Sequence, residues 1–201
     1  MKTFFKSDWF KCISVLLALA IVLGGLLAVL SDVLYVSPEE RTARAVQKIY
    51  GQAKEYSVVL DIDTNEDHSK IEYTTGSINK IYEVGDKTST SYDILFQTTG
   101  YEGYKNGTVT VWVQVIKSGD KYSIAKVVLE SFDKQTLMSK LDGGYYGKFT
   151  LTDVTDAYNK GEFFTTQTGK ENSNPVSNAT KSANAGNNAV NCVIKYLGEL
   201  S

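Results

Sequence analysis

A near-continuous apolar run over residues 13–30 is the feature that most constrains what this chain can fold into. At about 18 residues, the run is long enough for one helix to cross the hydrocarbon core of a bilayer. A signal peptide is the alternative, but its apolar region is shorter and ends at a cleavage site with small residues. Here Ala18 and Ala20 lie inside the run, and residues 28–31 make a poor cleavage site. The sequence therefore predicts an uncleaved transmembrane anchor over residues 12–31.

The charges that flank the run indicate its orientation. Three lysines and one aspartate precede it, whereas the basic residues that follow begin only at Arg41 and are mixed with acids. Positive flanks stay on the cytoplasmic side of a membrane. We therefore expect a single-pass protein of the cell membrane, with residues 1–11 in the cytoplasm and an extracytoplasmic main domain over residues 56–201.

The composition argues against several classes of function. The formal net charge is −2, so no broad nucleic-acid surface is expected. The single histidine, His68, argues against histidine metal sites and against Ser-His-Asp catalysis. Cys12 lies at the start of the apolar run and Cys192 near the C-terminus, so a membrane would keep them apart and no disulfide framework is expected. The acidic stretch over residues 61–68 offers cation ligands, but we interpret it as a solvated loop, and no metal site is predicted.

The rest of the chain predicts an α+β domain. Ser37, Pro38 and two acids read as a helix start, and Gly51 ends that helix, within a juxtamembrane segment over residues 32–55. Apolar and β-branched runs predict strands at residues 56–62, 70–73, 78–84, 91–98, 108–117 and 122–130. Helices are predicted at about residues 133–141 and 152–159. Strands followed by helices indicate an antiparallel sheet with helices packed on it.

The hairpin formed by residues 108–117 and 122–130 is the strongest strand pair. One face of its first strand carries Val109, Val111, Val113 and Val115. The second strand alternates less regularly, and simple alternation places Ile124 with Val128 on one face and Val127 with Leu129 on the other.

The segment Ser-Asn-Ala-Thr-Lys-Ser, residues 177–182, precedes a helical apolar stripe. The stripe consists of Ala189, Val190, Val193, Ile194 and Leu197. Thr180 is therefore predicted at or just before a helix N-terminus. Free backbone N–H groups and the helix dipole make such a place favourable for a phosphate. The threonine hydroxyl there either caps the helix or carries a phosphate.

This segment resembles a motif of FMN-binding domains. The G subunit of the Rnf complex and the C subunit of sodium-translocating NADH:quinone reductase carry Ser/Thr-Gly-Ala-Thr-x-Ser/Thr, in which a flavin transferase esterifies the threonine with FMN. Ser177, Ala179, Thr180 and Ser182 match this motif. Asn178 stands where the family has glycine, and asparagine is one of the few other residues that tolerates positive φ. Asn174 stands where the family often has aspartate.

The resemblance extends over most of the chain. The order of anchor, amphipathic helix and β-rich domain is similar, and residues 100–107 resemble the glycine-rich approach of the family. Gln135-Thr136-Leu137 is the nearest equivalent of the family's Glu-Thr-Pro-Gly-Leu-Gly loop and lacks its proline and glycines. The resemblance implies an electron-transfer subunit of an ion-translocating redox complex rather than a stand-alone enzyme. Its implied cofactor is FMN on Thr180, and the other implied site residues are Ser177, Asn178, Ala179, Ser182 and Thr136.

The implied partners are the membrane, the other subunits of the redox complex and a flavin transferase. Other interpretations stay open at this point. The serine, asparagine and threonine side chains are ordinary helix caps, and Asn178-Ala179-Thr180 is a glycosylation sequon, as is Asn106-Gly107-Thr108. The whole domain is alternatively a cofactor-free extracytoplasmic binding or structural module. Four tyrosines near glycines suit either flavin-ring contacts or ordinary packing: Tyr101, Tyr104, Tyr145 and Tyr146.

Overall fold

The computed structural model of the chain describes residues 8–34, 36–65, 67–86, 89–141 and 144–201. Most of the predicted cytoplasmic segment 1–11 lies outside these residues. The chain divides into two compact units, residues 1–41 and residues 42–201.

The first helix, α1 (Asp8–Leu34), contains the apolar run. Its segment Lys11–Ser31 is long and apolar enough to cross a membrane by length and composition, criteria that a signal sequence near an N-terminus also meets. Every side chain from Lys11 to Ser31 is exposed. The structure therefore shows one membrane-spanning candidate at the predicted place.

The second helix, α2 (Pro38–Tyr50), begins as the sequence predicts. The Ser37 hydroxyl oxygen accepts a hydrogen bond of 3.1 Å from the backbone N–H of Glu40, which satisfies one of the free amides of the first turn. The helix ends before Gly51, which adopts a φ of 74°.

The main domain is built on one antiparallel sheet. Its strands are β1 (Tyr56–Asp61), β2 (Ile71–Tyr73), β3 (Gly76–Val84), β4 (Ser91–Gly100), β5 (Val109–Ser118) and β6 (Lys121–Phe132). The strand order is β1-β3-β4-β5-β6, and β2 pairs with the free end of β3. All pairs are antiparallel. The α+β class is therefore confirmed.

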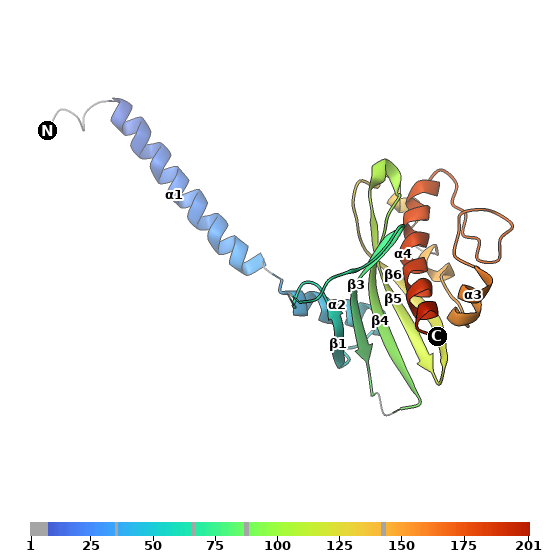
Figure 1. Cartoon of the computed structure of the whole chain (residues 1–201). Helices are drawn as coiled ribbons and strands as arrows, with labels where there is room; N and C mark the ends of the chain where they lie inside the picture. The colour runs from blue at the N-terminus through green and yellow to red at the C-terminus, as the bar shows by residue number, and fades with distance from the viewer. Residues whose placement is uncertain (1–7, 35, 66, 87–88, 142–143) are drawn as a thin grey trace. The chain divides into compact units, whose positions relative to one another are not determined.

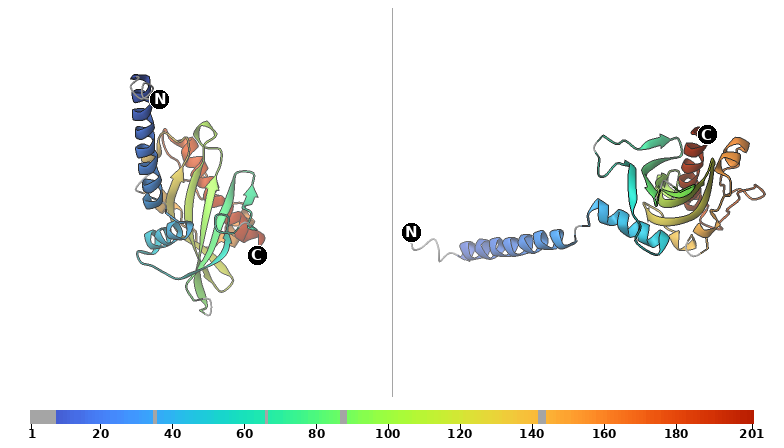
Figure 2. Two further views of the ribbon diagram at one scale, coloured as in Figure 1. Left: turned by 90° about the vertical axis from the view of Figure 1, so that its left-hand side faces the viewer. Right: turned by 90° about the horizontal axis from the view of Figure 1, so that it is seen from below.

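Helices cover both faces of this sheet, as Figures 1 and 2 show. On one face, Val46 and Ile49 of α2 pack against a cluster around Tyr82, Leu95 and Trp112. The other face carries the larger core, which receives α4 (Thr180–Glu199), the short helix α3 (Val154–Lys160) and the 3-10 turns η3 (Met138–Lys140) and η4 (Tyr146–Lys148). A third such turn, η2 (Tyr104–Asn106), follows β4.

Strand β5 follows the predicted alternation and β6 departs from it. Val109, Val111, Val113 and Val115 are all fully buried in the larger core. In β6 the register shifts between its Ile124 and Lys126 pairings, so Ala125 is an extra residue on that strand. The shift brings Ile124 and Val127 onto the same face, whereas Val128 packs on the α2 side. The prediction that Ile124 and Val128 lie on the same face of the sheet is therefore wrong.

The structure contradicts one of the two helices predicted after β6 and confirms the other. Residues 133–141 do not form a helix, because Lys134 adopts a left-handed φ of 54° and only η3 is helical. The predicted helix at 152–159 is confirmed as α3, which Asp153 caps through a 3.0 Å bond from the backbone N–H of Asp156.

The acidic stretch after β1 is not simply a solvated loop. Lys80 Nζ lies 3.1 Å from Asp61 Oδ1 and 2.8 Å from Asp63 Oδ2, and both Lys80 and Asp61 are buried. The Tyr82 hydroxyl donates a short hydrogen bond to Asp61 Oδ2 and lies 3.1 Å from the hydroxyl of Thr42 on α2. The buried charges at the junction of α2 with the sheet are therefore paired and hydrogen-bonded, as buried charges need to be.

Candidate functional site

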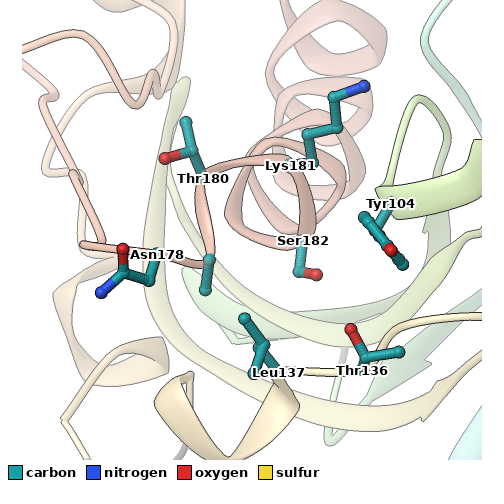
Figure 3. Close-up of a pocket in the computed structure, with 8 residues that line it drawn as sticks. Tyr104, Thr136, Leu137, Asn178, Thr180, Lys181 and Ser182 are labelled. Carbon is teal, nitrogen blue, oxygen red and sulfur yellow. The ribbon is translucent and has the colours of Figure 1, made fainter.

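A cavity of about 370 Å³ opens at the start of α4. Three segments wall it: the first turn of α4, the irregular loop after β6, and η2 (Figure 3). Its lining residues are Tyr104, Thr136, Leu137, Asn178, Ala179, Thr180, Lys181 and Ser182. Five of the six predicted site residues are therefore brought together, although Thr136 and Thr180 are far apart in the sequence. Ser177 is exposed and does not line the cavity.

The N-terminus of α4 has no side-chain cap. Ala179 is the N-cap residue, and it makes no side-chain hydrogen bond to the first turn. The first intrahelical bond runs from the backbone N–H of Ala183 to the carbonyl oxygen of Ala179 at 2.9 Å. The interpretation of Ser177, Asn178 or Thr180 as an ordinary cap is thus contradicted. Uncapped amides beside a cavity, together with the helix dipole, favour an anion.

Thr180 is the first residue of α4 and is exposed. Its hydroxyl donates a hydrogen bond of 3.3 Å to the carbonyl oxygen of Val176, one turn earlier. In Figure 3 this hydroxyl points away from the hydroxyls of Thr136 and Ser182. Threonine in a helix divides between two χ1 rotamers, one of which makes this kind of backbone bond. The other rotamer releases the hydroxyl from this bond.

Backbone strain is concentrated around this cavity. Asn178 has a φ of 65°, which confirms that it takes the conformation for which glycine is favoured. In the part of the chain that the structure describes, the five non-glycine residues with positive φ are Glu102, Lys105, Asn106, Lys134 and Asn178. Glu102, Lys105 and Asn106 lie in or just before η2, Lys134 lies in the loop after β6, and Asn178, which alone of the five lines the cavity, precedes α4. Such conformations cost about 1–3 kcal/mol each and cluster at functional sites.

The Gln135 side chain ties the three walls together. Its Oε1 accepts hydrogen bonds from Ser182 Oγ at 2.7 Å and from the backbone N–H of Tyr104 at 3.0 Å. Its Nε2 donates to the carbonyl oxygens of Asp133 at 2.8 Å and of Tyr104 at 3.3 Å. Because the Ser182 hydroxyl donates to Gln135, the group that Ser182 offers to a phosphate is its backbone N–H.

The rim of the cavity carries cationic and apolar groups. Lys181 is exposed on the first turn of α4, and Lys105 Nζ lies 5.5 Å above the ring of Tyr104. Lys134 is 3.6 Å from Asp133, its exposed neighbour. Tyr104 and Leu137 are each 39% exposed, so apolar surface remains open on two sides of the cavity. The site thus combines an anion-binding corner with an apolar slot, which is the usual layout of a cofactor pocket.

Of the four tyrosines near glycines, only Tyr104 lines the cavity. Tyr145 and Tyr146 are buried in the larger core, where burial raises the pKa of both phenols. The Tyr145 hydroxyl donates to the carbonyl oxygen of Ala183 at 2.9 Å and so fixes α4 from within the core. Tyr101 instead donates to Glu72 at the surface. Tyr145 and Tyr146 are therefore packing residues, and Tyr101 makes a surface hydrogen bond.

Some lining residues were not predicted from the sequence. Lys181 occupies the variable position of the motif, and Leu137 was noted only as a neighbour of Thr136. Asn174 does not line the cavity: it is buried, and neither polar atom of its side chain has a hydrogen-bond partner. The described residues contain no group of three or more His, Cys, Asp or Glu side chains that could hold a metal ion.

No protein-family model, no curated protein and no solved structure matches this chain.

Proposed function

We propose that this chain is a membrane-anchored flavoprotein that carries FMN as a phosphoester on Thr180 and passes electrons within a membrane redox complex. The observation that carries the proposal is the position of Thr180. Its hydroxyl stands at the uncapped start of α4, beside a cavity that the left-handed residue Asn178 also lines. The match of Ser177, Ala179, Thr180 and Ser182 to the FMN-attachment motif gives this position its chemistry.

The residues present fit a flavin mononucleotide. The backbone N–H groups of Lys181 and Ser182 and the hydroxyl of Thr136 suit the phosphate, and the Lys181 side chain adds a positive charge. Tyr104 and Leu137 supply apolar walls for an aromatic ring system. A cavity of about 370 Å³ is of the size usual for small-molecule sites. FMN, when bound, supplies one- and two-electron redox chemistry, and the protein supplies its position and electrostatic surroundings.

In the proposed attachment reaction, the FMN group of a flavin adenine dinucleotide donor is transferred to Thr180. A bond forms between Thr180 Oγ1 and the phosphorus next to the flavin ribityl chain. The pyrophosphate bond of a flavin adenine dinucleotide donor breaks, AMP leaves, and the threonine proton passes to solvent. The transferase supplies the catalysis, so this chain only has to present the hydroxyl. The left-handed Asn178 preserves the backbone turn that glycine provides in the motif, and so keeps Thr180 accessible.

The proposal also places the chain in the membrane. The segment Lys11–Ser31 acts as an uncleaved anchor, with the N-terminus cytoplasmic and residues 42–201 extracytoplasmic. The lysine-rich flank before the segment supports this direction. The proposed partners are the flavin transferase, which loads the protein, and redox subunits in the same membrane.

The test is to express the full chain with an active flavin transferase. We expect an intact mass raised by one FMN and in-gel flavin fluorescence. Thr180→Ala should abolish both, and Thr180→Ser should keep some of each because it retains a hydroxyl. Thr155→Ala, at a half-buried threonine on α3 that does not line the cavity, should load like the wild type. If the wild-type chain gains no flavin mass and no flavin absorbance, the carrier proposal fails and a cofactor-free module takes its place.

A further inference from the structure

The Gln135 amide reaches all three segments that wall the cavity. Its oxygen serves α4 through Ser182 and η2 through Tyr104, and its nitrogen serves η2 and the loop after β6. The side chain is only 7% exposed, so water does not replace these bonds easily. Two bonds to the oxygen and two from the nitrogen use the whole capacity of an amide.

The surrounding backbone is shaped around this one side chain. A Cβ added to Gly103 would lie 2.5 Å from the carbonyl oxygen of Gly107 and 2.6 Å from Gln135 Nε2, and one added to Gly107 would overlap both the carbonyl oxygen of Asp133 and Gln135 Nε2. The two glycines therefore let η2 approach the amide closely enough for both of its bonds. The backbone bond from Gly103 N–H to the carbonyl oxygen of Gly107, at 3.0 Å, closes the turn around it.

From this arrangement we infer that Gln135 is the positioning residue of the cavity, and that both its amide oxygen and its amide nitrogen are required. It touches Ser182 directly and sets Tyr104 and Thr136 relative to the start of α4. A carboxylate in its place keeps both acceptor roles but cannot donate to the carbonyl oxygens of Asp133 and Tyr104. The family that the chain resembles has glutamate at the equivalent place, but in a loop whose proline and glycines this chain lacks, so the inference concerns the contacts of this chain alone. As a statement about flavin attachment, this inference rests on the proposed function.

The chain offers a matched control for the test. Asn191 on α4 is also 7% exposed, and its amide accepts from the backbone N–H of Phe164 and donates to the carbonyl oxygen of Phe164, both at 2.9 Å. It does not line the cavity. Gln135→Glu and Asn191→Asp therefore make the same chemical change in equally buried amides, inside and outside the site.

Two measurements are made on the full chain in detergent: the rate of FMN attachment by the transferase, and peptide-resolved hydrogen exchange without flavin. We expect Gln135→Glu to slow attachment on the order of tenfold and to speed exchange over residues 103–107 by a similar factor, because buried bonds are lost. Asn191→Asp should attach FMN at the wild-type rate and should change exchange only near Phe164. If Gln135→Glu does not fold, Ser182→Ala removes only the bond to α4 and should show the same effects more weakly.

Each outcome is informative. Attachment to Gln135→Glu at the wild-type rate overturns the inference and leaves the proposed function standing. Equal losses in both variants also overturn it, because the effect is then a general loss of folding. If the wild-type chain takes no FMN, the proposed function fails, and exchange alone judges Gln135: unchanged protection over residues 103–107 overturns its positioning role, and faster exchange confined to the cavity walls supports it.

Discussion

Asn178 turns the backbone through a φ of 65° two residues before Thr180, the first residue of α4. This turn lets the chain enter the helix with Thr180 exposed and with Ala179 buried beneath it. A residue with a side chain thus keeps a conformation that most side chains avoid.

Substitutions at Asn178 should separate the backbone requirement from the side chain. Asn178→Gly should preserve or increase FMN loading, because glycine adopts positive φ without strain. Asn178→Val should lower the free energy of unfolding by about 1–2 kcal/mol and reduce loading, because a β-branched residue opposes this conformation. Intact mass reports loading, and denaturant unfolding of the same samples reports stability. Equal loading of the glycine and valine variants would show that the turn does not matter.

The close approach of β4 to α4 predicts an intolerant glycine. A Cβ on Gly100 would overlap the carbonyl oxygen of Ala185 and lie 2.5 Å from the amide nitrogen of Ala189. Because both are backbone atoms, Gly100→Ala should cost about 2–3 kcal/mol or more in unfolding free energy. Gly147→Ala, where nothing lies within 4 Å of the added carbon, is the control and should change stability little.

The buried pair of Asp61 and Lys80 predicts a pH dependence of stability. Burial raises the pKa of Asp61, but the hydrogen bonds from Tyr82 and Lys80 outweigh it, so the folded-state pKa lies below the ordinary 3.8. Burial lowers the pKa of Lys80, but its bonds to Asp63 and Asp61 raise it above 10.5. The contribution of Asp61 is therefore present above pH 3.8 and lost as the pH falls through its lowered pKa. The contribution of Lys80 is present below pH 10.5 and lost as the pH rises through its raised pKa.

Removing one partner of that pair should be costly. Lys80→Met leaves the Asp61 carboxylate buried without its cation and should lower the free energy of unfolding by about 3–5 kcal/mol at neutral pH. Lys160→Met, which breaks the exposed pair with Asp156, should leave stability nearly unchanged. Denaturant titrations at neutral pH measure both substitutions, and wild-type titrations carried below pH 3.8 and above pH 10.5 test the two pH dependences. A Lys80→Met protein as stable as the wild type would contradict the role of the pair.

The valine face of β5 should respond differently from the exposed edge of the sheet. Val113 is fully buried, and Val113→Ala should cost about 1–3 kcal/mol. Val59 on the edge strand β1 is 45% exposed, and Val59→Ala should cost much less. Thermal or denaturant unfolding compares the two, and similar losses would argue against the buried face.

The topology prediction needs intact cells. Protease added from outside, with any outer barrier opened, should remove the region after Ser31, and the anchor should stay with the membrane after carbonate extraction. The intact mass of the purified protein should be that of the uncleaved chain. Protection of the domain, or a mature protein that begins after the apolar run, would overturn the proposed anchor and its direction.

The sequence predicts the strands well because their signal is local. The alternation of Val109 to Val115 and the turn after them define the hairpin of β5 and β6. The faces of β6 could not be predicted, because the extra residue Ala125 shifts the register and only the partner strand reveals it. The helix predicted at residues 133–141 is absent for a similar reason, because the Gln135 side chain binds Tyr104 and Ser182, which are distant in sequence.

The candidate site was partly predictable for the same reason. The motif around Thr180 could be read from the sequence, and so could the likeness of residues 135–137 to the family's Glu-Thr-Pro-Gly-Leu-Gly loop. Both Thr180 and Thr136 line the cavity. That Tyr104 would join them, rather than Tyr101 or Tyr145, depends on the fold of η2. The engagement of the Ser182 hydroxyl with Gln135 likewise required the structure.

The sheet of this domain separates two apolar clusters, one on each of its faces. The helix α2 packs on one face through Val46 and Ile49, and α4 with the cavity at its start packs on the other, and the two apolar clusters share no residue. The same strands contribute to both clusters, because neighbouring residues of a strand point to opposite faces of the sheet. Substitutions on the α2 side of the sheet that keep its apolar cluster should therefore leave the cavity at the start of α4 unchanged. A single sheet thus keeps the packing of α2 separate from the packing that holds the cavity.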